Sequence, residues 1–187
     1  MSQDTKQRVC PVENAGTLDN KIRKFLQNPR KILKPYVRSG MTVLDVGCGP
    51  GVFSIEMAEM VGPSGNVVAA DLQEGMLQLL KEKIKGTPLE KIVEPYKCEA
   101  SRIGLTRKVD FVLAFYMVHE VPDKRSFFKE IRTILRDNEA MLIVEPNFHV
   151  SKKAFGEMLD SLVDLRFEVI ERPRFFFSRS VLVKNVN

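Results

Sequence analysis

A short glycine-rich segment that follows a hydrophobic run constrains this chain more than any other feature. Residues 43–51 read Val-Leu-Asp-Val-Gly-Cys-Gly-Pro-Gly, a strand-like run that ends in three glycines. Gly47 and Gly49 allow a sharp turn and a close approach to a ligand, because they carry no Cβ. A helix that begins after the turn would offer free N–H groups to an anion. The segment therefore predicts a ligand site at the carboxyl ends of the strands of an open α/β sheet; the alternative is a turn needed only for packing.

Strand-like and helix-like segments alternate along the chain, which predicts a mostly parallel sheet with helices on both faces. Only Arg172-Pro173 separates the last two strand-like runs, so we expect a hairpin there and one antiparallel strand. A length of 187 residues suits one domain. The runs are Thr42–Val46, Val67–Ala70, Lys91–Lys97, Asp110–Phe115, Met141–Glu145, Arg166–Glu171 and Arg174–Lys184.

Three apolar patterns between these runs have helical spacing. They comprise Met76, Leu77, Leu80 and Ile84; Phe127, Phe128, Ile131, Ile134 and Leu135; and Phe155, Met158, Leu159, Leu162 and Val163. Asp123 and Ser151 are the expected N-caps of the last two helices. A basic helical region is expected at about residues 19–38, with a break near Asn28-Pro29, and residues 1–16 are expected to be loosely ordered. We expect one domain over residues 1–187, with an N-terminal extension of basic helices at 1–40 and the core at 41–187.

Two nucleotide-binding patterns compete for the glycine segment. A dinucleotide fingerprint needs glycines at i, i+2 and i+5. Counting from Gly47, position i+5 is Val52, and the third glycine comes early, at Gly51. This spacing weakens an interpretation as an NAD site without removing it. A Walker loop is excluded because no Gly-Lys-Ser/Thr follows.

The stretch Val43–Gly51 resembles motif I of the class I S-adenosylmethionine-dependent methyltransferases, whose usual form is Asp-x-Gly-x-Gly-x-Gly. The resemblance covers about residues 28–148, and the last two strands match the terminal antiparallel strand of that family. It is closest to the small-molecule group that includes the ubiquinone- and menaquinone-type methyltransferases. The resemblance implies a Rossmann-like, seven-stranded, mostly parallel sheet. It also implies S-adenosyl-L-methionine as cofactor and S-adenosyl-L-homocysteine as product.

The resemblance also assigns roles to individual residues. Asp45 would help to organise the methionyl end of the cofactor above the glycine turn, and Asp71 would accept hydrogen bonds from both ribose hydroxyls. Leu72 would pack on the adenine, Glu99 would bind its amino group, and the Ala100 N–H would meet a ring nitrogen. The cofactor-binding set is Asp45, Gly47, Cys48, Gly49, Asp71, Leu72, Glu99, Ala100 and Phe115. Asp71 could instead be a helix N-cap and Glu99 a surface acid, since Cys98-Glu99-Ala100 stands where relatives often carry Gly-Asp-Ala.

The segment from Phe115 to Asp123 resembles the loop that follows the fourth strand in this family. It contains His119, our candidate for a general base, because an unperturbed imidazole titrates near neutrality. Its alternative is a structural hydrogen bond to a neighbouring loop or helix. Tyr116 could orient a substrate or close the adenosine pocket. Asn147 and His149 are expected to cap a loop rather than to touch substrate. Residues 1–40 and the loops at 116–123 and 146–151 are expected to cover the active site.

Composition limits the remaining function classes. The chain has three cysteines without paired spacing, which suggests neither a disulfide framework nor a zinc site, and we expect no metal. The polar start and the short apolar runs predict a cytoplasmic protein without a signal peptide or membrane span. A net charge of +5 is compatible with an anionic partner but does not require one. The basic helix face Arg30, Lys31, Lys34 and Arg38 makes a nucleic-acid partner possible but not favoured over a solvated face.

We therefore expect a methyltransferase that acts on a small molecule. An NAD-dependent oxidoreductase, or a non-catalytic cofactor-binding or partner subunit of a methyltransferase, is the alternative. The sequence leaves open the acceptor, its nucleophilic atom and the oligomeric state. Phe175, Phe176 and Phe177 are expected to lie on a strand, where core packing is favoured over a hydrophobic substrate wall.

Overall fold

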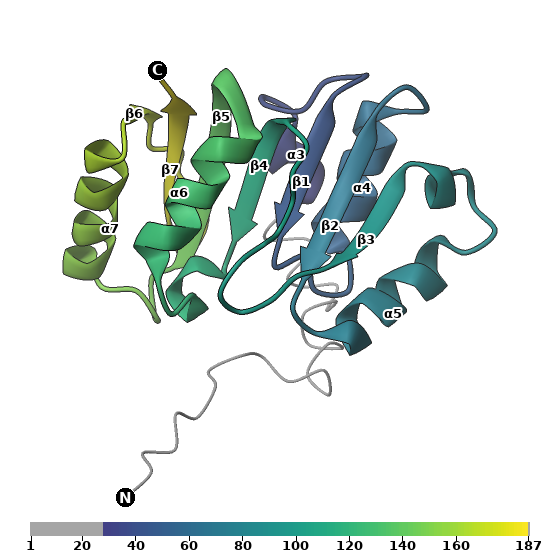
Figure 1. The fold of residues 1–187 in the computed structure, drawn as a ribbon, viewed down its shortest axis with the longest axis horizontal. Helices are drawn as coiled ribbons and strands as arrows, with labels where there is room; N and C mark the ends of the chain where they lie inside the picture. The colour runs from purple at the N-terminus through teal and green to yellow at the C-terminus, as the bar shows by residue number, and fades with distance from the viewer. Residues whose placement is uncertain (1–27, 187) are drawn as a thin grey trace, which may run out of the picture.

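The computed structural model describes residues 28–186, and these form one seven-stranded sheet with the order β3-β2-β1-β4-β5-β7-β6 (Figure 1). Pairing is parallel from β3 to β5, whereas β7 runs antiparallel to both β5 and β6. The predicted fold, with one antiparallel strand near the C-terminus, is therefore confirmed. The strands are β1 (Thr42–Val46), β2 (Asn66–Asp71), β3 (Val93–Lys97), β4 (Val109–Phe115), β5 (Leu135–Pro146), β6 (Phe167–Glu171) and β7 (Ser178–Asn185).

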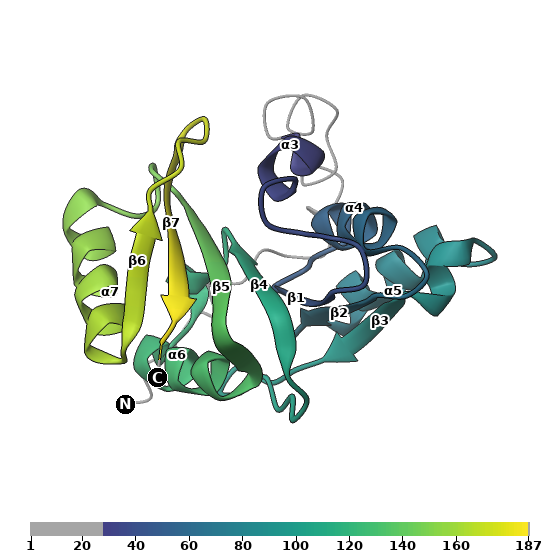
Figure 2. The same ribbon diagram turned by 90° about the horizontal axis from the view of Figure 1, so that it is seen from above.

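Helices cover both faces of the sheet, and Figure 2 shows α3 and α4 opposite α6 and α7. The first face carries α3 (Pro29–Leu33), α4 (Val52–Val61) and α5 (Glu74–Ile84), and the second carries α6 (Lys124–Ile134) and α7 (Lys152–Asp164). The segments η2 (Pro88–Lys91) and η3 (Val118–Glu120) are short 3₁₀ helices. The expected loose segment at 1–16 and the predicted helical region before residue 28 lie outside the described residues.

The helical patterns place the expected side chains in two cores. Met76, Leu77, Leu80 and Ile84 are buried on α5, as are Phe127, Phe128, Ile131 and Ile134 on α6. The side chains of Asp123 and Ser151 accept hydrogen bonds from Ser126 N and Ala154 N, so both predicted N-caps are confirmed. Val163 is 56% exposed, contrary to the prediction. It follows the buried Leu162, and one residue turns the side chain by about 100° on a helix.

Several boundaries differ from the prediction. The third strand, predicted from Lys91, begins at Val93, because η2 extends to Lys91. The strand β5 begins at Leu135, directly after α6. The strand β7 begins at Ser178 because residues 172–177 form a loop that ends in a turn. Phe176 and Phe177 lie in that turn and are 58% and 62% exposed. The prediction that these two rings pack in the core is therefore wrong. Phe175 packs at the margin of the first-face core.

The edge strand β3 contains a proline. Val67 N donates to Ile92 O, and Cys98 N donates to Asp71 O, so alternate residues of β3 bond to β2. Pro95 lies at the intervening register, opposite Ala69, and its nitrogen faces away from β2. The proline therefore costs no hydrogen bond within the sheet.

Candidate active site

The glycine loop turns at the carboxyl end of β1 and contacts the loop that follows β4. Gly47 N and Cys48 N both donate to Ala70 O, at 2.8 and 3.0 Å, which joins the loop to the end of β2. Gly47 has φ +69°, and a Cβ there would lie 2.8 Å from Met117 Cβ. A side chain at this position would therefore force the two loops apart, which explains the glycine. Gly49 has open space around it, so the turn is accessible at its middle.

Asp71 ends β2 with a buried carboxylate that is 6% exposed. One oxygen accepts a hydrogen bond from Gly49 N at 2.9 Å, and the other accepts from Gln73 N at 2.8 Å. Burial raises the pKa of Asp71. The two backbone hydrogen bonds stabilise the ionised carboxylate and act in the opposite direction. The residue thus ties the glycine loop to the start of α5. Each carboxylate oxygen can accept more than one hydrogen bond, so this role leaves capacity for ligand hydroxyls.

Asp45 lies within β1, before the glycine loop, and is 2% exposed. Its Oδ2 accepts a hydrogen bond from Ser54 Oγ at 2.6 Å, which links β1 to α4. Burial raises the pKa of Asp45 to about 7. The Cys48 side chain is also buried, in the first-face core, and its backbone N donates to Ala70 O. Burial raises the pKa of the Cys48 thiol, as expected for a cysteine that packs like an apolar residue.

The predicted adenine contacts lie in the loop between β3 and β4. Glu99 and Ala100 are exposed, and Glu99 exchanges backbone hydrogen bonds with Arg102 in a tight turn. Cys98 N donates to Asp71 O, which places this turn beside the end of β2. The half-buried Leu72 follows directly. These three residues thus border one region, although their predicted contacts with adenine stay predictions.

An aromatic cluster joins the end of β4 to α4. The ring of Phe115 lies 4.3 Å from that of Phe53 on α4 and 4.5 Å from that of Tyr116, measured between centroids. Tyr116 has φ +59°, a conformation uncommon for a non-glycine residue. Its hydroxyl lies 2.6 Å from Ser178 Oγ at the start of β7. The sharp turn after β4 is therefore held by a contact across the sheet edge.

His119 pairs with an acid that the sequence analysis did not select as a site residue. His119 Nδ1 lies 2.7 Å from Oε2 of Glu145, which is 1% exposed and comes from β5. The other oxygen of Glu145 accepts from Val118 N at 3.0 Å. The hydrogen bond to Glu145 raises the pKa of His119. The available signal was the acid in Val144-Glu145-Pro146 at a strand end, on the same edge as His119.

The neighbouring loops complete this edge. The ring of His149 stacks on that of His119 with centroids 5.4 Å apart. Asn147 N donates to Phe177 O at 3.0 Å, which joins the loop after β5 to the turn before β7. Glu120 is half-buried, and burial raises its pKa. No group of three or more potential metal ligands forms within residues 28–186.

The comparison with known proteins now identifies the family. A family model described as "Methyltransferase domain" matches residues 37–170. The chain belongs to the class I S-adenosylmethionine-dependent methyltransferases. This membership confirms the predicted family and its cofactor, and it supports S-adenosylmethionine over NAD as the ligand of the glycine loop. The open turn at Gly49 and the acceptor capacity of Asp71 fit that cofactor.

Similar proteins span different shares of the chain. A crystal structure of a SAM-dependent methyltransferase from Aquifex aeolicus matches 95% of this chain and 100% of its own, with a TM-score of 0.86 and 28% identity. A demethylmenaquinone methyltransferase from Lactobacillus johnsonii is 33% identical over 131 residues, which is 70% of this chain and 51% of that protein. One from Lactococcus lactis is 29% identical over 167 residues, or 83% and 66%. The chain thus spans about half to two thirds of these curated relatives.

Within the described part of the chain, the helices are too short or too polar to traverse a bilayer.

Proposed function

We propose that this chain transfers a methyl group from S-adenosylmethionine to a small-molecule acceptor whose nucleophile must lose a proton. The observation that carries the proposal is the 2.7 Å contact between His119 and the buried Glu145. It stands at the carboxyl edge of the sheet, in the loop whose Met117 contacts Gly47. A histidine held by a buried carboxylate beside the cofactor loop is suited to general base catalysis.

Glu145 determines which nitrogen of His119 can act. An ionised carboxylate only accepts hydrogen bonds, so Nδ1 of the neutral ring carries the proton and Nε2 is the acceptor, 4.0 Å from Glu120 Oε1. Once Nε2 has taken a proton from the acceptor, the imidazolium is stabilised by the same carboxylate. Glu145 thus acts as a positioning residue, and the Val118 N–H holds its second oxygen.

The other site residues would bind and orient. The cofactor supplies an electrophilic methyl group when bound, and the protein's task is then alignment. Asp71 would accept hydrogen bonds from the ribose, while Asp45 and the glycine loop would border the methionyl end. Phe115 would lie against the cofactor from the β4 side, since its ring packs between Phe53 and Tyr116. These assignments rest on the family resemblance together with the positions described above.

The names of the two relatives, both demethylmenaquinone methyltransferases, support a small aromatic or quinone-type acceptor. A nucleic-acid acceptor has less support, because one member of the basic face at residues 30–38 already forms ion pairs. Arg30 Nη1 lies 2.8 Å from Glu56 Oε1 and 3.5 Å from Glu59 Oε2. A partner subunit without catalysis is the remaining alternative.

A transfer assay with methyl-labelled S-adenosylmethionine tests the proposal. We expect label in a pool of small aromatic and quinone-type metabolites, and none in total RNA or protein. Calorimetry should show S-adenosylhomocysteine bound more tightly than NAD. Binding without transfer to any pool would support the non-catalytic alternative, and label in RNA alone would overturn the proposed acceptor class.

A further inference from the structure

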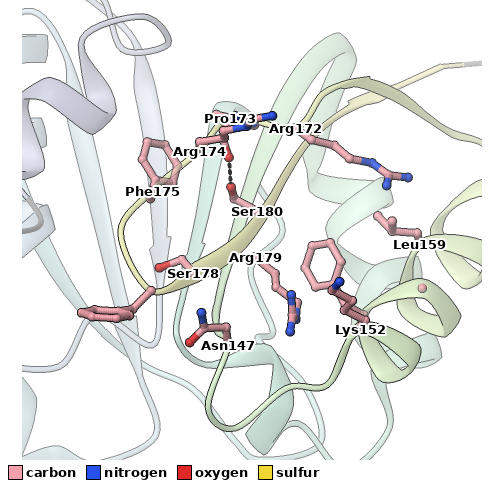
Figure 3. Close-up of a pocket in the computed structure, with 13 residues that line it drawn as sticks. Asn147, Lys152, Leu159, Arg172, Pro173, Arg174, Phe175, Ser178, Arg179 and Ser180 are labelled. Atoms are coloured by element: carbon pink, nitrogen blue, oxygen red, sulfur yellow. Dashed lines mark hydrogen bonds between the residues drawn. The ribbon is translucent and has the colours of Figure 1, made fainter.

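A groove lies between α7 and the loop that joins β6 to β7, outside the residues assigned to the cofactor. Its volume is about 590 Å³, which is in the range of small-molecule sites. Figure 3 shows its lining from three directions: Asn147 after β5, Lys152 and Leu159 on α7, and residues 172–175 and 177–180 of the loop and β7. The groove thus lies beside β7, at the carboxyl ends of the parallel strands, where the loop with His119 also lies.

Every charged side chain that lines the groove is basic: Lys152, Arg172, Arg174 and Arg179. None of the four forms an ion pair with another residue in the described range 28–186. Arg179 is nevertheless oriented, since its Nε donates to Val150 O at 2.9 Å. In Figure 3 the side chains of Arg172 and Arg179 extend from the strand side toward α7. The groove therefore concentrates positive charge without an internal counter-ion.

Phenylalanine and leucine side chains supply the apolar part of the lining. Phe155 and Leu159 belong to the second-face core and border the groove from α7, while Phe175 and Phe177 border it from the loop. Gly156 lies between them on the helix, where a glycine costs about 1 kcal/mol relative to alanine. A Cβ at Gly156 would meet no atom within 4 Å, so packing does not require the glycine. It leaves the helix side of the groove open.

The loop that forms the opposite wall is held in place. Ser180 Oγ donates to Pro173 O, as the dashed line in Figure 3 shows, and Ser178 N donates to Phe175 O at 3.2 Å. The Ser178 hydroxyl also lies 2.6 Å from Tyr116 Oη, directly after β4. The same residue thus lines the groove and contacts the loop that leads to His119. The groove wall and the loop that leads to His119 are therefore connected through this hydrogen bond.

We propose that this groove binds the anionic end of an amphipathic small molecule, an aromatic or alkyl acceptor that carries a carboxylate or phosphate. The proposal rests on the proposed function, because it assigns the substrate class of that site. The four basic groups bind the anion, and the phenylalanine and leucine walls bind the adjoining apolar part. A single-stranded RNA is the less suitable occupant, because the basic groups surround one small groove instead of following an extended path.

Binding of 2-naphthyl phosphate and 2-naphthoate to the full chain at low salt tests the proposal, with neutral 2-naphthol as the matched ligand. Calorimetry should show both anions binding at least tenfold more tightly than 2-naphthol. The double variant Arg172→Gln/Arg174→Gln should lose at least tenfold in anion affinity. The control Lys108→Gln/Lys129→Gln removes two exposed charges elsewhere and should leave it unchanged within twofold.

Gly156 offers a second test that does not alter charge. Gly156→Ala should fold and keep anion binding, whereas Gly156→Leu should fill the groove and reduce it at least tenfold. S-adenosylhomocysteine affinity should be unchanged in all these variants, which separates a loss of groove binding from damage to the cofactor site. Normal anion binding without methyl transfer would contradict the proposed function and leave the groove assignment intact. Equal anion affinity in wild type and Arg172→Gln/Arg174→Gln would overturn the proposal. So would tighter binding of a 12-nucleotide RNA, or binding only to anionic phosphatidylglycerol vesicles.

Discussion

Two buried carboxylates stand on the same edge of the sheet, yet they are held in opposite ways. Asp71, at the end of β2, accepts from two backbone amides, those of Gly49 and Gln73. Glu145, on β5, accepts from the Val118 amide and pairs with the imidazole of His119. The carboxylate of Asp71 is therefore held by backbone N–H groups of two neighbouring turns. The carboxylate of Glu145 also pairs with a titratable side chain from another loop.

We propose that this difference separates a cofactor half of the site from an acceptor half. Backbone donors are available whatever the side chains are, so the cofactor half depends on glycines and chain geometry and can be read as a short motif. The acceptor half depends on side chains from β4, β5 and β7, far apart in the sequence. Substitutions should therefore divide into effects on cofactor affinity and effects on turnover.

The largest expected effect is on turnover. With His119→Ala, the proposed base is lost, and we expect kcat to fall by about 10²–10⁴-fold while S-adenosylhomocysteine affinity stays within twofold. Steady-state kinetics on an acceptor found in the transfer screen, together with calorimetry, measures both. A stable variant with near-normal turnover would show that alignment alone carries the reaction.

The pH profile provides the control for this assignment. Only neutral imidazole accepts a proton, so the wild-type rate should rise with pH through one ionisation above the usual histidine value near 6.5, because Glu145 raises the pKa of His119. Glu145→Gln should move this limb to lower pH. A purely structural Glu145 would lower stability and leave the limb where it is.

An intermediate effect is expected on cofactor binding. Asp71→Ala removes the proposed charge-assisted hydrogen bonds to the ribose, each about 1.5–3 kcal/mol, so S-adenosylhomocysteine affinity should fall tenfold or more. Calorimetry measures it, and circular dichroism checks that the variant folds. Asp160→Ala on the exposed face of α7 is the matched control. Unchanged affinity in folded Asp71→Ala would reduce Asp71 to a link between the glycine loop and α5.

The last effect concerns stability. Burial raises the pKa of Asp45 from 3.8 to about 7, so the folded state binds the proton more tightly than the unfolded state. Wild-type stability therefore decreases as pH rises between those values. Asp45→Asn stays neutral and should be more stable than the wild type at pH 8 without cofactor, by up to about 4 kcal/mol, with about 2–4 °C in Tm for each kcal/mol. The gain should vanish near pH 4; an equal gain at both pH values contradicts this account.

Local chemistry explains what the sequence alone could predict. The glycine loop, the N-caps Asp123 and Ser151 and the buried faces of the helices depend on neighbours within a few residues, and they were predicted. Glu145 was missed as a site residue because its partner stands 26 residues away and only the pairing of β4 with β5 joins them. The basic groove was missed for the same reason. Phe176 and Phe177 were misplaced because a turn, set by the contacts of Ser178 and Ser180, overrides their strand propensity.

Pro95 has a consequence for self-association. An open edge strand offers unpaired backbone donors on which a second copy of the sheet could extend. In β3 the proline removes a donor from that outward row, and the charged Glu94 and Lys97 stand beside it. At the opposite edge, the register of β6 shifts between Val169 and Glu171, which interrupts a regular ladder. Both borders of the sheet are thus poor templates for strand addition, and the protein should resist edge-to-edge aggregation at high concentration.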